Sequence, residues 1–357
     1  MRVYNFSAGP SVLPESVLHR VQNEFLDYNG SGMSIVEMSH RGKVFDEVAK
    51  SCEALFRKVL GISDDYYVLF LQGGASMQFD AVPLNLMTTG KADYIVTGNF
   101  ANKAAKEAAK YGTVNVVASS KEANYTYIPK TERKDFDSDV SYTHFTSNNT
   151  IFGTRFTSLP DSPTPLVCDM SSNILSEEID VNKFGLIYAG AQKNIAPAGM
   201  TLVIVRKDLI GNPLPICPTM LKYSTQAEND SMYNTPPCFP IYVSKLVLEW
   251  LLDLGGIKAI NQQNVYKAGL LYDFIDNSAF FTNPVNVEDR SIMNVPFVSP
   301  SAELDAKFVK EAAAAGLVSL KGHRLVGGMR ASIYNAMPVE GVVALIDFMK
   351  KFEMENK

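Results

Sequence analysis

Cysteine is scarce in this sequence, with four residues among 357, at positions 52, 168, 217 and 238. They are far apart, no C-x-x-C motif occurs, and no two histidines have the spacing of a zinc site. This pattern excludes a zinc module and the disulfide framework of a small secreted domain. We therefore predict reduced, mostly structural thiols and no bound metal.

The sequence also lacks long apolar runs and blocks of like charge. Crossing a bilayer takes about 20 consecutive apolar residues, and no run approaches that length. The net charge of -5 argues against a nucleic-acid-binding protein. The N-terminus, MRVYNFSAGP, lacks the basic and then apolar pattern of a signal peptide. We predict a cytoplasmic protein that binds neither membranes nor nucleic acids.

What the sequence does contain is an alternation of helical stretches with short apolar strands. Its length of 357 residues leads us to expect two domains. Helical spacing occurs at 14–29, 43–60 and 101–110. Strands separated by helices predict βαβ units and a mainly parallel, doubly wound sheet. The expected strands are 66–71, 93–98, 114–119, 142–147, 165–169, 185–190 and 200–205.

The second half of the chain contains an irregular stretch, 213–240, with six prolines. A loop of that length inside a compact domain is usually functional or an interface arm. A long helix is expected at 241–254, ending at two glycines. An αβ module then follows, with a helix near 302–315 and a strand near 329–336.

Lys193 is the only charged residue between Phe184 and Val205, in a run that reads as two apolar strands joined by a turn of small residues. Burial favours the neutral amine of a lysine and lowers its pKa. A neutral lysine amine condenses with carbonyl compounds, and pyridoxal 5′-phosphate (PLP) is the commonest carbonyl held that way. The alternative is a turn lysine with its ammonium in water and its stem along apolar surface.

Three further features bear on this lysine. Residues 72–76, QGGAS, follow a strand and open a helix, where backbone N–H groups can bind a phosphate. Asp169 ends an apolar strand at the sheet edge, where a carboxylate can pair with the pyridine nitrogen of PLP. Phe100 follows another strand and can stack on the PLP ring. Taken singly, each feature has an ordinary explanation. Residues 72–76 fit a tight turn, Asp169 fits a helix N-cap, and Phe100 fits a core aromatic. Together, in this order on successive βα units, they match a fold-type I PLP enzyme.

Basic residues narrow the class of substrate. His40-Arg41 and His323-Arg324 are two histidine–arginine pairs, which can bind a phosphate or a carboxylate. Arg330 begins a strand of the C-terminal module, where it can hold an α-carboxylate. Each of these arginines also fits an ordinary surface position.

Seven segments spread along the chain carry a family resemblance. The most specific are YAGAQKNIAPAG (188–199), SMYNTPP (231–237) and KGHRLVGGMRASIYNAMP (321–338). The others are NFSAGP (5–10), SHRGK (39–43), LQGGAS (71–76) and NNTIFGTRF (148–156). From end to end, the chain resembles the phosphoserine aminotransferases, which belong to the class-V, fold-type I PLP-dependent aminotransferases.

The resemblance implies a role for each matching residue. Lys193 would bind PLP covalently and shuttle a proton between substrate and cofactor. Asp169 would pair with the pyridine nitrogen, and Phe100 would stack on the ring, in place of the tryptophan frequent in this family. The other cofactor contacts would come from Ala75, Ser76, Thr150, Gln192, Asn234 and Thr235. The substrate would be bound by Arg330 at its α-carboxylate and, at its distal anion, by His40, Arg41, His323 and Arg324.

The resemblance also implies a homodimer with shared active sites, because Asn234 and Thr235 would reach the PLP phosphate of the other subunit. Residues 14–255 would form a large PLP-binding domain, with a mainly parallel seven-stranded sheet flanked by helices. Residues 1–13 and 256–357 would form a smaller α/β domain.

The implied activity is a reversible ping-pong transfer of the amino group from L-glutamate to 3-phosphohydroxypyruvate, giving O-phospho-L-serine and 2-oxoglutarate in serine biosynthesis. The sequence does not distinguish this acceptor from 3-hydroxy-4-phosphohydroxy-2-oxobutanoate of pyridoxine biosynthesis, because one anion site serves both acids. The alternative is an alanine-glyoxylate or serine-pyruvate type aminotransferase of the same fold. Such an enzyme would keep Lys193 and Asp169 but would not need two histidine–arginine pairs.

Overall fold

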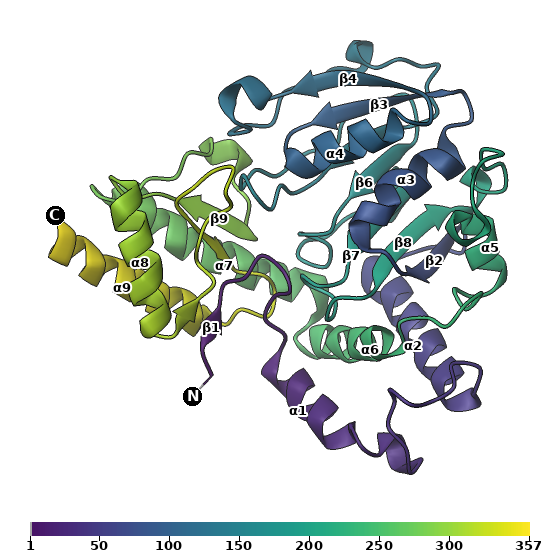
Figure 1. Ribbon diagram of the computed structural model, residues 1–357, viewed down its shortest axis with the longest axis horizontal. Coiled ribbons are helices and arrows are strands. Elements are labelled where there is room, and N and C mark those ends of the chain that lie inside the picture. The colour runs from purple at the N-terminus through teal and green to yellow at the C-terminus, as the bar shows by residue number, and fades with distance from the viewer. Residues whose placement is uncertain (1) are drawn as a thin grey trace.

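The computed structural model describes residues 2–357, and within them seven strands form one sheet (Figure 1). The strand order is β2-β8-β7-β6-β5-β3-β4. Neighbouring strands are parallel except at β8, which is antiparallel to both β2 and β7. The predicted α/β fold with a mainly parallel sheet is therefore confirmed. The strands are β2 (Tyr66–Leu71), β3 (Lys91–Val96), β4 (Thr113–Ser119), β5 (Thr143–Thr146), β6 (Leu166–Asp169), β7 (Leu186–Gly190) and β8 (Thr201–Arg206).

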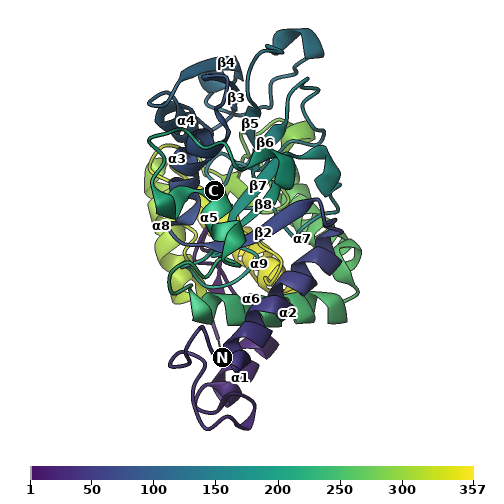
Figure 2. The same cartoon turned by 90° about the vertical axis from the view of Figure 1, so that its right-hand side faces the viewer.

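Helices cover both faces of the sheet because its central strands are apolar on both sides. Successive residues of a strand point to opposite faces. Ile187 of β7 packs in one core with α2 (Lys43–Leu60) and α6 (Cys238–Asp253), which lie side by side (Figure 2). Leu186 packs in the opposite core, with α3 (Gly74–Leu86) and α4 (Asn99–Ala108). This two-sided burial explains why the strands read as continuous apolar runs.

Some predicted element boundaries are wrong. The helix expected at 14–29 is α1 (Glu15–Glu24), and a 3-10 turn follows at Tyr28–Gly30, where Asn29 has a left-handed φ of 50°. Within the irregular stretch 213–240 the structure contains a short helix, α5 (Tyr223–Glu228). These differences concern only where elements begin and end. Tertiary packing sets those boundaries, and neither helix propensity nor periodicity specifies them.

The C-terminal part of the chain has its own apolar core. β9 (Asn294–Phe297) pairs antiparallel with β11 (Met329–Ser332). The strand expected at 329–336 therefore ends at Ser332 and is shorter than predicted. β1 (Tyr4–Asn5) pairs parallel with β10 (Leu317–Val318), which ties the N-terminal strand to this module. The core is rich in edge-to-face phenylalanine pairs, one of them Phe281 with Phe308. The surrounding helices are α7 (Gly256–Asn277), α8 (Ala302–Ala314) and α9 (Val339–Asn356).

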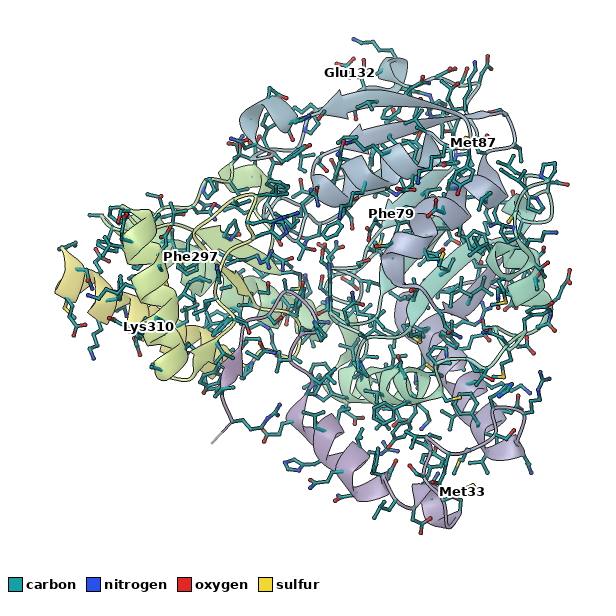
Figure 3. The ribbon with its side chains drawn as sticks, in the orientation of Figure 1. Met33, Phe79, Met87, Glu132, Phe297 and Lys310 are labelled. Carbon is teal, nitrogen blue, oxygen red and sulfur yellow. The ribbon has the colours of Figure 1, made fainter. Side chains whose placement is uncertain are left out.

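Residues 25–42, which join α1 to α2, lie at the lower end of the molecule in Figures 1 and 2. Met33, in this segment, is labelled there in Figure 3. The segment exposes apolar side chains, with Leu26 81% and Val36 52% accessible. In residues 2–357 no helix combines the length and apolarity that crossing a membrane would require.

Candidate active site

Two oppositely charged side chains meet at the carboxyl edge of the sheet. Asp169 is the last residue of β6, and Lys193 lies in the turn between β7 and β8. Because β6 and β7 are neighbouring parallel strands, their carboxyl ends share one edge. The charge of each side chain shifts the pKa of the other. The structure therefore brings these two predicted residues into one site.

Asp169 is buried, and its carboxylate has one backbone partner. Its Oδ1 accepts a hydrogen bond from the N–H of Ser171 at 2.9 Å. Burial raises the pKa of Asp169, while the hydrogen bonds from Ser171 and the charge of Lys193 oppose that shift. A carboxylate held in this way can stabilise a proton on a basic ring nitrogen nearby.

The Lys193 side chain points toward Thr150, in the loop that follows β5. Its Nζ donates a hydrogen bond to Thr150 Oγ1 at 2.7 Å and lies 5.9 Å from the centroid of the Phe100 ring. The pKa of Lys193 is lowered to about 8, chiefly by burial; the charge of Asp169 opposes this shift and that of Arg330 adds to it. A substantial fraction of this amine is therefore neutral near pH 8 and able to act as a nucleophile.

The turn around Lys193 is fixed by backbone hydrogen bonds. The Ala191 carbonyl accepts from the N–H groups of Lys193 and Ala196, each at 2.8 Å. The N-terminal segment packs on the turn from outside, because the Ser11 N–H donates to the Gln192 carbonyl at 3.0 Å and the Ser11 hydroxyl donates to the Lys193 carbonyl. The amine is thus carried by a rigid backbone.

The glycine turn at the start of α3 leaves backbone donors unused. Gly73 and Gly74 have left-handed φ angles of 88° and 66°, and a Cβ on Gly73 would lie 2.6 Å from Met77 Cβ. The next residues, Ala75 and Ser76, are in the first helical turn, whose N–H groups have no partner within the helix. These groups and the helix dipole favour a phosphate at this position.

Asn234 and Thr235 lie beside the same turn in the irregular stretch. Both are exposed, and the Thr235 carbonyl accepts a hydrogen bond from the Gln72 side chain at 2.8 Å. Gln192, another predicted cofactor contact, is half-buried next to Lys193. A Cβ on Gly190 would lie 2.8 Å from Gln192 Oε1, so this side chain occupies the space above the end of β7.

Phe100 lies in the first turn of α4, directly after a close backbone approach. A Cβ on Gly98 would lie 2.4 Å from Asn149 Oδ1, so only glycine fits there without movement. Asn149 in turn donates to Thr97 Oγ1 at 3.1 Å and to Thr154 Oγ1 at 3.0 Å. This contact holds the start of α4, and with it the half-buried Phe100 ring, beside the loop that contains Thr150.

Arg330 reaches the same loop from the C-terminal module. Its Nη1 donates to the Thr150 carbonyl at 3.1 Å, so Arg330 and Lys193 share one neighbouring residue. Its Nε is buried and has no hydrogen-bond partner among the described residues. An unpartnered guanidinium N–H next to the amine is suited to a carboxylate ligand, which would accept two parallel hydrogen bonds.

His323 and Arg324 lie near Arg330, in the turn between β10 and β11. Burial lowers the pKa of His323, and the positive charges of Arg330, Arg324 and Lys103 lower it further. Every charge that shifts this histidine is positive, so an anion bound among these groups would be favoured. The structure thus places one of the two predicted histidine–arginine pairs at the site.

His40 and Arg41 make no hydrogen bond or ion pair with Lys193 among the described residues. They belong to the 25–42 segment, which lies at the lower end of the molecule, whereas α4 and β3 lie at its upper end (Figure 1). Arg41 is exposed, and His40 Nε2 is buried without a hydrogen-bond partner among the described residues. The sequence motif identified the pair but did not indicate this separation.

Two residues near the site were missed in the sequence. Lys103 follows Phe100 by one helical turn, and its Nζ lies 5.7 Å from the Phe100 ring centroid. Tyr334 is buried, and its hydroxyl donates to the Ala8 carbonyl at 2.7 Å. The helical spacing signals Lys103, but nothing local signals Tyr334. Among residues 2–357, no three histidine, cysteine or acidic side chains form a group that could hold a metal ion.

The side chains present fit PLP. Asp169 offers a buried carboxylate for the ring nitrogen, Lys193 a partly neutral amine for the aldehyde, and the first turn of α3 unused N–H groups for the phosphate. The aromatic face of Phe100 lies next to that amine. The orphaned Nε of Arg330 adds a donor for a bound carboxylate.

Comparisons with known proteins agree with this site. The Aminotransferase class-V family pattern matches residues 3–345. A phosphoserine aminotransferase of Bacillus cereus is 57% identical, over all of this chain and 99% of its own. A solved phosphoserine aminotransferase from Bacillus circulans subsp. alkalophilus has a TM-score of 0.97 at 48% identity, covering 100% and 99% of the two chains. A PLP-bound one from Trichomonas vaginalis has a TM-score of 0.93 at 41% identity, covering 98% of this chain and 100% of its own.

Proposed function

Because the chain belongs to the class-V aminotransferase family, we propose that it is a PLP-dependent phosphoserine aminotransferase. It transfers the amino group of L-glutamate to 3-phosphohydroxypyruvate and yields O-phospho-L-serine and 2-oxoglutarate, as expected of an enzyme of serine biosynthesis. The observation that carries the proposal is the cluster of Arg330, His323 and Arg324 beside Lys193. Arg330 serves the α-carboxylate, and Arg324 together with His323 serves a distal anion.

PLP, when bound, supplies an electron sink for the negative charge that develops at the α-carbon of the amino acid. The residues of this chain supply the rest. Asp169 would keep the ring nitrogen protonated, and Phe100 would pack against the ring. Lys193 would hold the cofactor covalently and move the proton, a role suited to an amine whose pKa is about 8. Ala75, Ser76, Thr150 and Gln192 complete the cofactor contacts.

The distal anion site explains how one pocket accepts two acids. The glutamate side chain ends in a carboxylate and 3-phosphohydroxypyruvate in a phosphate, so both present an anion at the far end. His323 and Arg324 carry that recognition from the same chain. A shared cationic site removes the need for a separate pocket for each substrate.

We further propose a homodimer in which His40, Arg41, Asn234 and Thr235 act in the site of the other subunit. Three features support it: the place of the 25–42 segment at the lower end of the molecule, outside the sheet (Figure 1), its exposed apolar side chains, and the orphaned His40 Nε2. In this arrangement residues 14–255 act as the cofactor-binding domain. Residues 1–13 and 256–357 form the small domain that carries Arg330.

The activity is tested by giving purified protein PLP, L-glutamate and one of four 2-oxo acids. We expect rapid 2-oxoglutarate release with 3-phosphohydroxypyruvate and much slower release with pyruvate or glyoxylate. The fourth acid, 3-hydroxy-4-phosphohydroxy-2-oxobutanoate, shows whether the anion site also takes the longer substrate. Equal rates with pyruvate would contradict the phosphate site and favour the alanine-glyoxylate type of aminotransferase. Lys193→Ala is expected to abolish turnover.

The shared site is tested by mixing two inactive variants. Lys193→Ala and Arg41→Ala protomers, mixed and reassociated, form a heterodimer in which one site has an intact Lys193 from one chain and an intact Arg41 from the other. We expect part of the activity to return. No recovery, despite heterodimers seen by mass spectrometry, would place Arg41 in its own subunit's site or outside any site.

A further inference from the structure

Lys267 is a buried lysine that the proposed reaction does not use. It lies on α7 and is 1% exposed. The acceptors of its ammonium are all backbone carbonyl oxygens, in the turn that joins β11 to α9. Its Nζ donates to the carbonyls of Ile333 (3.2 Å), Tyr334 (3.0 Å), Asn335 (3.4 Å) and Met337 (2.9 Å).

This ring of carbonyls is a site for a cation. An ammonium has three N–H donors, and four oxygens at these distances use all of them, whereas a neutral amine would have only two donors. Burial lowers the pKa of Lys267 to about 7, and the carbonyl oxygens oppose that shift because they favour the charged form. Removing the ammonium would leave the carbonyls of Ile333, Asn335 and Met337 without this donor, whereas the Tyr334 carbonyl would keep the N–H of Met337.

The turn held by Lys267 is bonded on its other side to the active-site loops. The N–H of Asn335 donates to Asn194 Oδ1 at 3.0 Å, and Asn194 directly follows Lys193. The side chain of Asn335 donates to the Leu175 carbonyl at 2.8 Å, in the segment that follows the Asp169 strand. One turn therefore contacts both segments that carry the central pair of charged residues.

α7 strengthens the same junction with two asparagines. Asn264 Nδ2 donates to Asn335 Oδ1 at 2.8 Å, and Asn261 Nδ2 donates to the Ser176 carbonyl at 3.1 Å. Asn264, Asn335 and Lys267 are all buried. α7, the β11–α9 turn and the loop after β6 are thus joined by polar contacts, most of them buried.

We propose that Lys267 is a positioning residue that fixes the strand of Arg330 relative to Lys193 and Asp169. Arg330 precedes the first of the four carbonyl residues, Ile333, by three positions on the same strand and turn. A shift of this turn moves the guanidinium against the amine, and a misplacement of about 1 Å at an active site can cost about 100-fold in rate. The inference rests on the proposed transaminase function, in which these groups hold one substrate.

The test compares Lys267→Met with Phe352→Leu, a core variant of the same module that removes none of the hydrogen bonds of the junction. Hydrogen exchange of peptides covering 191–196 and 329–338 is measured on both proteins, together with kcat and KM for glutamate. We expect faster exchange in both peptides and a 10- to 100-fold lower kcat/KM for Lys267→Met only. Equal behaviour of the two variants would overturn the proposal, because a general loss of stability would then explain both.

A second variant keeps the test open if Lys267→Met does not fold. Lys267→Ala leaves room for n-propylammonium, which has the missing carbons and the ammonium. Added propylammonium is expected to raise the thermal midpoint of this variant and restore slow exchange in both peptides, without an effect on the wild type; no response would overturn the proposal. If the wild type transfers no amino group to any 2-oxo acid, the proposed function fails, while the exchange experiment still reports on Lys267.

Discussion

Replacing Lys193 by methionine should make the cofactor-free protein more stable at pH 7, because the substitution removes a half-buried ammonium whose pKa desolvation lowers. The pKa of Lys193 is lowered from 10.5 to about 8. Each pKa unit corresponds to about 1.4 kcal/mol, so holding the charged lysine in this site costs the folded protein about 3 kcal/mol. The lost hydrogen bond to Thr150 offsets about 1 kcal/mol of that. We expect a net gain of about 2 kcal/mol.

The stability gained by Lys193→Met should decrease as the pH rises. Below pH 8 the lysine is charged in both the folded and the unfolded protein, so the folded state bears the full cost. Between pH 8 and 10.5 the folded protein loses its proton first, and the stability of the wild type rises with pH. The advantage of Lys193→Met should therefore shrink through that range and be lost above it.

The assay is urea denaturation of PLP-free wild type and Lys193→Met at pH 7 and at pH 10. The control is Lys310→Met, which replaces an exposed lysine on α8 (Figure 3) and should change the free energy of unfolding by less than about 0.5 kcal/mol. Lower stability of Lys193→Met at pH 7, or a gain that does not change with pH, would refute the reasoning. Either result would mean that desolvation of the charged Lys193 does not destabilise the folded protein.

Three more predictions follow from the site geometry. Gly98→Ala places a Cβ 2.4 Å from Asn149 Oδ1 and should lower the free energy of unfolding, measured by thermal denaturation, by about 1–3 kcal/mol. An unchanged thermal midpoint would mean that the start of α4 can move freely. Arg330→Lys loses the planar fork of donors, so KM for glutamate should rise about tenfold or more while PLP titration is unchanged. Asp169→Asn removes the carboxylate that holds the ring proton, so kcat should fall at least about 100-fold; near-normal kcat would remove Asp169 from the mechanism.

The central part of the site was predictable from local sequence. Asp169 and Lys193 each follow a buried apolar strand, and parallel strands present their carboxyl ends at one edge, so strand order alone brings them close. The glycine turn before α3 was equally visible, because left-handed φ angles select glycine. These features depend on a few neighbouring residues.

The remaining features depend on contacts between distant parts of the chain. Lys267 looks like any helix lysine, because the four carbonyls that hold it come from residues 333–337, at least 66 positions later. The motif around Arg41 singled out the residue but did not indicate that it would lie in the 25–42 segment at the lower end of the molecule (Figure 1). α1 ends at Glu24, and Asn29 takes a left-handed conformation in the 3-10 turn that follows, neither of which periodicity detects. In each case the missing information is tertiary.

The reversal of direction at β8 has a consequence for motion. A parallel strand after β7 would need a long helical crossover, whereas an antiparallel one needs only the short segment 191–200 between two buried strands. The backbone of Lys193 is thus clamped at both ends, and only its four-carbon side chain is free to swing. Side-chain rotation takes picoseconds to nanoseconds, while loop opening takes nanoseconds to microseconds or longer. We expect the amine to relocate without waiting for its loop, so the slow steps of a catalytic cycle lie elsewhere in the molecule.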